Sequence, residues 1–292
     1  VVLEVGLGGE LDSTNVIDVP ELALIANIGL DHTRELGPTI PDIARAKAGI
    51  IKSGGDVVVY GMNPEADAVF TSVCAERHAR LTYVDHSRIQ NLRPSLEGLT
   101  FDFGERKDLT CPLIGAYQPH NAALALTAIE ILNEKGWHIS DNAVREGLAC
   151  VRWPARFEVL MRAPLFIADG GHNPQGVAAA IESLRLHLPG KKPVFLLGMM
   201  ADKDVPHMLE RIAPLCRIAV TVTPGNPRAL PAEELAARMR ALDVPAEAVE
   251  SVEAGVCRAL ELAGTEGTVC ALGSLYMLGD VRAFINSQTR IQ

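Results

Sequence analysis

The sequence is poor in aromatic side chains and lacks the patterns typical of several protein classes. Phe, Trp and Tyr make up 4% of its 292 residues, whereas the hydrophobic share reaches 48%. This balance favours sheets covered by helices over a β-sandwich and is sufficient for a full core. No apolar run is long enough to span a bilayer, and no signal peptide is visible. We therefore expect a cytoplasmic protein without a membrane segment.

Positive charge is also scarce. The 27 Lys and Arg residues are outnumbered by 36 Asp and Glu residues, which leaves a formal net charge of -9. This balance argues against a general nucleic-acid binder, so an anionic substrate has to be held by local donors, helix N-termini or metal ions. The six cysteines are scattered and form no C-x-x-C pair, as expected of a reduced intracellular protein.

Short β-rich runs alternate with helical patterns, which is typical of parallel α/β units. In the first half we predict strands at residues 1–5, 22–28, 56–60 and 81–84, helices at 40–51, 65–79 and 121–135, and a small hairpin within 88–110. In the second half we predict strands at 165–168, 193–197, 217–222 and 268–272, and helices at 174–187, 206–215, 231–242, 255–263 and 277–286. We expect two α/β domains, at residues 1–151 and 152–292, with a hinge at 152–155.

Polar residues follow the first predicted strands, where open α/β sheets bind ligands. Glu4 lies in the first apolar run, and Gly6-Leu7-Gly8-Gly9 follows without matching G-x-G-x-x-G. Glu4 therefore suits a salt bridge, a surface position or a metal site. His32 is either a structural hydrogen-bonding group or, with Glu4, a ligand of a divalent ion. Lys47 taken alone is typical of a solvated helix lysine.

In the second half, the run from Asp169 through Gly170-Gly171-His172-Asn173 to Pro174 predicts a strand, a turn and a helix start. Asn173 suits the N-cap, and capping alone would explain it. The backbone donors of that helix would face whatever Asp169 and His172 bind. The turns at residues 198–204 and 273–276 lie at equivalent strand ends, as either ordinary polar loops or parts of a site.

These signals occur together in one known order. The string Glu-Val-Gly-Leu-Gly-Gly-x-Leu-Asp-Ser-Thr-Asn at residues 4–15 resembles the signature of folylpolyglutamate synthase and the bifunctional dihydrofolate synthase, in the Mur-ligase superfamily. Similar matches occur at residues 28–32, 47–50, 117–122, 156–157, 169–174, 202–204 and 273–276. The resemblance implies the remainder of a parallel-sheet, P-loop-type ATPase (central) domain, followed by a Rossmann-like C-terminal α/β domain.

The resemblance also implies a reaction and its substrates. ATP would phosphorylate a substrate carboxylate, and the amino group of L-glutamate would attack the resulting acyl phosphate. The carboxylate would belong to dihydropteroate or be the γ-carboxylate of a folate. Mg²⁺ would neutralise and align the anions, and K⁺ or another monovalent cation is a further expected cofactor. We expect a monomer that binds these small molecules and no nucleic acid.

The family's functional residues map onto named positions of this sequence. The resemblance implies Glu4 and His32 as metal ligands, together with Lys47, which matches a lysine that is carbamylated in relatives. The implied ATP contacts are Asn121, Arg156 and Asp169. The implied substrate contacts are Asp12, His172, Ser274 and Tyr276. The residues expected to take part in catalysis are Lys47, Asp169 and His172.

Two features depart from the family pattern. Gly171 precedes His172 where relatives often have Ala, a minor change between small residues. No G-x-x-G-K-[ST] loop occurs in the 292 residues, and in the family this loop lies upstream of the strand that carries Glu4. Since the chain also opens without Met, we expect an N-terminally truncated enzyme that is inactive as given. The alternatives are another ligase of the superfamily, acting on a peptidoglycan precursor, and a non-catalytic nucleotide-binding fragment.

Overall fold

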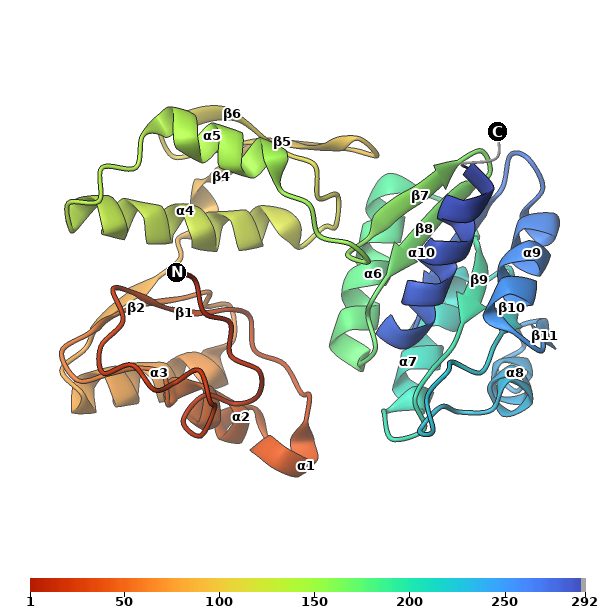
Figure 1. Cartoon of the computed structure of the whole chain (residues 1–292), viewed down its shortest axis with the longest axis horizontal. Coiled ribbons are helices and arrows are strands. Elements are labelled where there is room, and N and C mark those ends of the chain that lie inside the picture. Colours follow the sequence, from red (N-terminus) through yellow and green to blue (C-terminus); the bar gives the residue numbers. More distant parts are fainter. Residues whose placement is uncertain (290–292) are drawn as a thin grey trace. The chain divides into compact units, whose positions relative to one another are not determined.

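The computed structural model describes residues 1–289, which form two compact units (Figure 1). The first unit comprises residues 1–93, 100–110 and 118–150, and the second comprises residues 94–99, 111–117 and the chain from Val151 onward. Each unit contains a sheet of wholly or mainly parallel strands with helices packed against it. The predicted α/β class is therefore confirmed.

The sheet of the first unit has three parallel strands in the order β1 (Ala23–Ile25), β2 (Asp56–Val59) and β3 (Arg80–Tyr83). Side chains alternate across a strand, so Val57 and Val59 lie on one face with Ile43 and Phe70. These partners come from α2 (Ile40–Ala48) and α3 (Pro64–Glu76), while α4 (Gln118–Glu134) packs against β2. Figure 1 shows α4 on the side of the sheet opposite α3.

Local sequence sets the starts of these helices. Thr39 and Asp42 form a reciprocal capping box at α2, and the Asn63 side chain accepts the Ala66 N–H at α3. Pro41 and Pro64 lie in the first turns, where a missing N–H leaves no hydrogen bond unmade.

A meander of β4 (Ile89–Ser95), β5 (Gly98–Phe103) and β6 (Arg106–Cys111) replaces the predicted hairpin. Most of it belongs to the first unit, whereas residues 94–99 and 111 group with the second. Glu130 of α4 accepts two hydrogen bonds from Arg88 and one from Arg106. The short helices α1 (Thr33–Leu36) and η1 (His86–Arg88), and α5 (Asp141–Cys150), were not predicted from the sequence.

The predicted strand at residues 1–5 is wrong. These residues form no strand, and Val1, Val2 and Leu3 are exposed. A strand requires a hydrogen-bonded neighbour, and the three-stranded sheet described here ends at β1. An apolar β-branched run alone therefore does not define a strand at this position.

The sheet of the second unit has six strands in the order β11-β10-β9-β12-β8-β7. The parallel members are β8 (Leu165–Asp169), β9 (Val194–Leu197), β10 (Ile218–Thr221), β11 (Ala246–Ala248) and β12 (Thr268–Leu272). The edge strand β7 (Glu158–Arg162) pairs antiparallel with β8. The short edge strands β7 and β11 were not predicted from the sequence.

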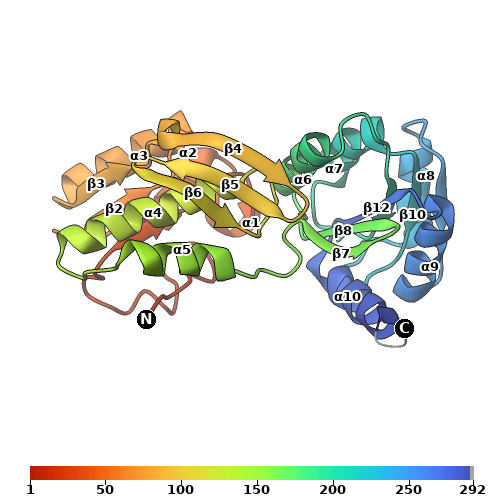
Figure 2. The same ribbon diagram turned by 90° about the horizontal axis from the view of Figure 1, so that it is seen from above.

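Helices cover both faces of this sheet. One core cluster joins it to α6 (Pro174–His187), α7 (Val205–Ile212, followed by η2, Ala213–Leu215) and α8 (Ala232–Arg240). A second cluster joins it to α9 (Val252–Ala263) and α10 (Leu275–Thr289). Figure 2 shows α6 and α7 on one side of β8 and α10 on the other. Buried faces leave the carboxyl edge of the sheet as the place for polar loops.

Within residues 1–289, no helix combines the length and the apolar character needed to cross a membrane.

Candidate active site

Asp169 ends β8 at the carboxyl edge of the six-stranded sheet and is only 3% exposed. Its Oδ1 accepts the Gly171 N–H at 2.8 Å, and its Oδ2 accepts the Phe157 N–H at 2.8 Å and the Tyr117 hydroxyl at 3.4 Å. Burial raises the pKa of the Asp169 carboxyl, and these donors together with the Arg156 guanidinium oppose that shift. The carboxyl group therefore organises the backbone around it.

Arg156 lies between two residues in the left-handed backbone region, Ala155 (φ 58°) and Phe157 (φ 50°). Such values are unfavourable for residues other than glycine and need support from their surroundings. Asp169 provides support at Phe157, and the Gly170 N–H donates to the Ala155 carbonyl at 2.8 Å. Nη1 of Arg156 lies 3.2 Å from the point where a Gly170 side chain would begin. A cationic group is thus held beside the turn that follows Asp169.

The turn after β8 leads into α6 through a tight backbone approach. A Cβ at Gly171 would lie 2.8 Å from the backbone of Gly176, and the Asn173 side chain accepts the Gly176 N–H at 2.7 Å as the N-cap. Nδ1 of His172 lies 2.8 Å from the Gly170 carbonyl oxygen, which can only accept, so Nδ1 carries the proton. The backbone donors at the start of α6 suit an anion.

The end of β12 adjoins this turn. Ser274 is buried, and its hydroxyl accepts the Tyr276 N–H at 3.2 Å. The next side chain, Leu275, lies 2.5 Å from the Cβ that Gly170 lacks. The second unit thus brings the predicted residues of its half to neighbouring loops at one sheet edge: Arg156, Asp169, His172, Ser274 and Tyr276.

The loops after β9 and β10 are joined by an ion pair that sequence reasoning missed. Arg228 donates to Asp202 at 3.0 Å, and the next aspartate, Asp204, caps α7. The sequence singled out residues 202–204 as a motif, but nothing in its spacing pointed to Arg228. The Arg228 side chain is 56% exposed, and an exposed pair contributes up to about 1 kcal/mol. Its effect is to tie two loops of the same edge together.

The glycines of the first unit's signature have a packing role. A Cβ at Gly49 would lie 2.4 Å from the Glu10 backbone nitrogen, and one at Gly9 would lie 2.8 Å from the Ala46 carbonyl oxygen. The Glu10 N–H donates to Ala46 at 3.4 Å, and the Asn15 side chain donates to the Gly49 carbonyl at 3.2 Å. The Gly-rich segment therefore lies directly against the end of α2, where Lys47 is half-buried.

Asp12 folds this Gly-rich segment. It accepts the N–H groups of Gly6, Leu7 and Thr14, each at 2.9 Å, and the Thr14 hydroxyl at 2.7 Å. The Thr14 hydroxyl, followed by the backbone donors, lowers the pKa of Asp12 to about 2. All four contacts are made to the ionised carboxylate, which is thereby fixed in position as an acceptor.

Two of the residues predicted as metal ligands, Glu4 and His32, lie in exposed positions of the first unit. His32 is the exposed N-cap of α1, with ring nitrogens 4.0 Å from Asp31 and Glu35, and Glu4 lies in the exposed segment before the glycines. No group of three or more His, Cys, Asp or Glu side chains suited to a metal ion occurs in the part of the chain that the structure describes.

Asn121 lies in the first turn of α4, and its side chain donates to Gln118 Oε1 at 3.1 Å. It belongs to the first unit, whereas Arg156 and Asp169 belong to the second. The three predicted nucleotide contacts are therefore divided between the units.

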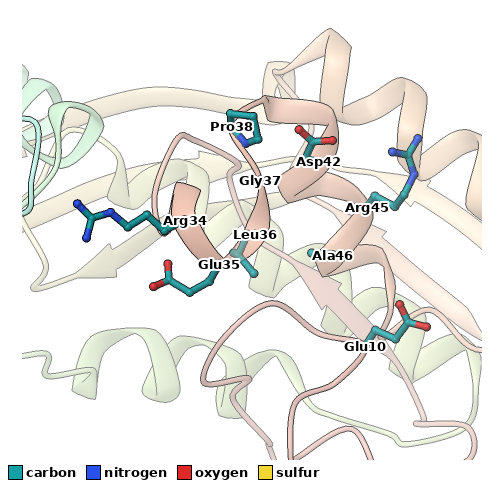
Figure 3. Close-up of a pocket in the computed structure, with 9 residues that line it drawn as sticks. All are labelled: Glu10, Arg34, Glu35, Leu36, Gly37, Pro38, Asp42, Arg45 and Ala46. Carbon is teal, nitrogen blue, oxygen red and sulfur yellow. The ribbon is translucent and has the colours of Figure 1, made fainter.

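A shallow cavity of about 550 Å³ in the first unit lies among α1, α2 and the loop that carries Glu10 (Figure 3). Its charged lining residues include Arg34, Glu35 and Arg45. The Arg34 and Arg45 side chains point in opposite directions in Figure 3, so they form no joint anion clamp. None of the residues predicted from the sequence lines this cavity.

Residues 155–275 match the family model described as Mur ligase, glutamate ligase domain. The dihydrofolate synthase/folylpolyglutamate synthase of Bacillus subtilis is 34% identical over 290 residues, which cover 97% of this chain and 66% of the relative. The folylpolyglutamate synthase of Lacticaseibacillus casei is 37% identical over 237 residues, or 79% of this chain and 55% of the relative.

Solved structures agree with these relatives. The folylpolyglutamate synthase of Mycobacterium tuberculosis, complexed with ADP and AMPPCP, superposes with a TM-score of 0.86 at 29% identity, over 96% of this chain and 67% of that one. FolC of Escherichia coli, in complex with DHPP and ADP, gives a TM-score of 0.83 at 30% identity, over 98% and 66%. The chain spans about half to two thirds of the length of the curated relatives named first. This chain belongs to the folylpolyglutamate synthase/dihydrofolate synthase family of Mur ligases.

Proposed function

We propose that the chain is part of an ATP-dependent carboxylate–amine ligase that adds L-glutamate to dihydropteroate, to the γ-carboxylate of a folate, or to both. The observation that carries this proposal is the similarity to folylpolyglutamate and dihydrofolate synthases over nearly the whole chain. Solved relatives bound to ADP or AMPPCP support ATP as the nucleotide. The relatives named here are folate enzymes, which favours this proposal over a peptidoglycan-precursor ligase.

The proposed reaction has two steps. A substrate carboxylate oxygen attacks the γ-phosphorus of ATP and ADP leaves, which gives an acyl phosphate. The amino nitrogen of glutamate then attacks the acyl carbon, loses a proton and expels inorganic phosphate, which leaves an amide. Both steps bring anions together, so positive charge and oriented N–H donors lower the barrier.

The second unit offers such groups at one edge. We propose that the Arg156 guanidinium and the N–H groups at the start of α6 hold nucleotide oxygens, with Asp169 keeping the Arg156 segment in its strained conformation. His172, Ser274 and Tyr276 are proposed for the glutamate side, and Asp12 for the folate side. Mg²⁺, a carbamylated Lys47 and a monovalent cation such as K⁺ stay predictions from the resemblance. A monomeric, cytoplasmic enzyme without nucleic-acid partners is likewise a proposal.

The proposed function is tested in a chimera that fuses the preceding segment of the Bacillus subtilis relative to residue 1. This segment should supply the phosphate-binding loop that the 292 residues do not contain. The chimera should extend dihydropteroate or tetrahydrofolate with glutamate in an ATP-dependent manner, as followed by ADP release and product mass. The 292 residues alone should be inactive as a ligase. A folded chimera that turns over a peptidoglycan precursor and neither pterin substrate would overturn the proposal.

A further inference from the structure

Residues 111–117 connect β6 to α4 and group with the second unit, although residues 100–110 and 118–150 on either side belong to the first. Ile114 is 4% exposed and lies in the core cluster that contains α6. Leu96, from the other short segment that groups with the second unit, packs against the same cluster. Residues 111–117 are therefore packed as part of the second unit.

Helix α6 holds this connection through two side chains. The Ser183 hydroxyl accepts the Ala116 N–H at 2.9 Å and donates to the Ala179 carbonyl at 2.7 Å, and Ser183 is fully buried. Nε2 of His187 lies 2.6 Å from the Ile114 carbonyl oxygen, which can only accept, so this nitrogen donates. Ser183 lies within the helix, and its hydroxyl accepts a hydrogen bond from a neighbouring segment. The side chain therefore connects that segment to the helix.

Asp169 completes the attachment from the sheet. Its Oδ2 accepts the Tyr117 hydroxyl at 3.4 Å and the Phe157 N–H at 2.8 Å, and the Phe157 ring stacks on His187 with centroids 5.8 Å apart. A Cβ at Gly115 would lie 2.8 Å from the Tyr117 ring, so glycine permits this ring to fold back over the connection. These contacts link residues 114–117 to the segment that carries Arg156.

We propose that Ser183, His187 and Tyr117 are positioning residues, and that with Asp169 they form a clamp on residues 114–117. Helix α4 begins at Gln118, the residue directly after the clamped segment. On the return path, residues 151–154 belong to no helix or strand. The role of the clamp in positioning rests on the proposed ligase function. The contacts that form the clamp do not depend on that function.

The clamp is tested first by hydrogen exchange on the 292-residue chain. Ser183→Ala leaves the half-buried Ala116 N–H without its acceptor, and His187→Phe keeps the ring stack but removes the donor to Ile114. Amides 114–117 should exchange about tenfold faster in each variant. His187→Gln, which retains a side-chain N–H donor, should restore part of the protection. Ser287→Ala is the control, because within residues 1–289 the hydroxyl of this serine donates to the Phe284 carbonyl of its own helix.

The second measurement separates positioning from mere structure. In the active chimera, Ser183→Ala and His187→Phe should lower kcat several-fold with KM for ATP nearly unchanged, and Ser287→Ala should change neither. Unaltered exchange at residues 114–117 would show that the clamp does not exist, whether or not the chimera is a ligase. Faster exchange with normal kcat would show that the clamp has no positioning role. A chimera without ligase activity would overturn the proposed function and with it the positioning role, while the exchange data would still decide the clamp.

Discussion

The two sheets of this protein differ in how fully they are covered. The six strands of the second unit carry helices on both faces, and Phe195 and Leu196 on adjacent positions of β9 are both fully buried. In the first unit, Leu24 of the end strand β1 is 42% exposed, and Leu11 and Val16 of the preceding segment are 97% and 81% exposed. Burial of an apolar side chain therefore depends on the partner against which its segment packs, and not on its apolar character alone.

The largest expected effect tests whether the two units are stabilised independently. Phe70 in the first unit and Phe195 in the second are both 0% exposed. Replacing either by Ala should cost about 3–5 kcal/mol, through lost burial and the cavity left behind. Hydrogen exchange should show that Phe70→Ala weakens protection in α2 and α3 only, and that Phe195→Ala weakens it around β9 only. Loss of protection in both units from either change would mean that they unfold as one.

The next prediction compares the chemistry assigned to the two units. In the active chimera, Glu4→Gln, His32→Ala and Lys47→Ala should each lower turnover by about a hundredfold or more, as expected for groups that stabilise the transferring phosphoryl group. His138→Ala, in the same unit, serves as the control. Turnover is to be measured across a Mg²⁺ titration. Near-normal turnover of all three variants would show that these residues are not essential. The groups required for catalysis would then lie in the second unit and in the fused segment.

A smaller effect on stability is expected at the close backbone contact between the Gly-rich segment and the end of α2 in the first unit. Gly49→Ala would place a Cβ 2.4 Å from Glu10 and should destabilise the unit by about 1–3 kcal/mol in urea unfolding. Gly147→Ala is the matched control, since a Cβ there meets no atom within 4 Å and the residue lies in α5. This control should be neutral or stabilising by up to about 1 kcal/mol. Equal effects of the two changes would mean that the Gly-rich segment is not packed against α2.

The smallest expected effect concerns pH. The pKa of Asp12 is lowered to about 2, so the stability that its carboxylate contributes is present above its ordinary value of 3.8 and is lost as the pH falls through 2. Thr14→Val removes the largest cause and should raise that pKa toward the ordinary value, as followed by carbon NMR of the Asp12 carboxyl group. Thr71→Val, which removes a hydroxyl bonded to Tyr83, should leave the pKa unchanged. No difference between the two variants would contradict the assigned hydrogen bonds.

Much of the fold followed from local patterns in the sequence. The strands and helices of the second unit lie within a few residues of their predicted limits, because apolar runs, N-cap residues and first-turn prolines mark them. The edge strands β7 and β11 gave no such signal, and helix α5 was missed although Ser140 directly precedes it and the Ser140 hydroxyl accepts the Ala143 N–H. The strand predicted at residues 1–5 was wrong because an apolar sequence indicates that a segment tends to be buried. It does not show that a neighbouring strand is present to form hydrogen bonds with it.

The site was less accessible to sequence reasoning. Asp169 and His172 were recognisable as a strand-to-helix turn, and Asn173 as a cap, because these roles are local. The partners of Asp169 were not, since Tyr117 is 52 residues away and Phe157 contributes a backbone N–H that no side-chain pattern encodes. The pair of Arg228 and Asp202 was not predicted either, because 26 residues separate them in the sequence. Tertiary pairing of distant groups has no signature in spacing.

Helix α6 has a mechanical consequence beyond its packing. Its first turn is capped by Asn173 beside the Asp169 turn, and its second half carries Ser183 and His187. At 1.5 Å per residue its 14 residues form a rod about 20 Å long. A helix of this length moves largely as one body, so we expect a displacement of the turn at its amino end to be accompanied by a shift of residues 114–117, which Ser183 and His187 hold near its other end.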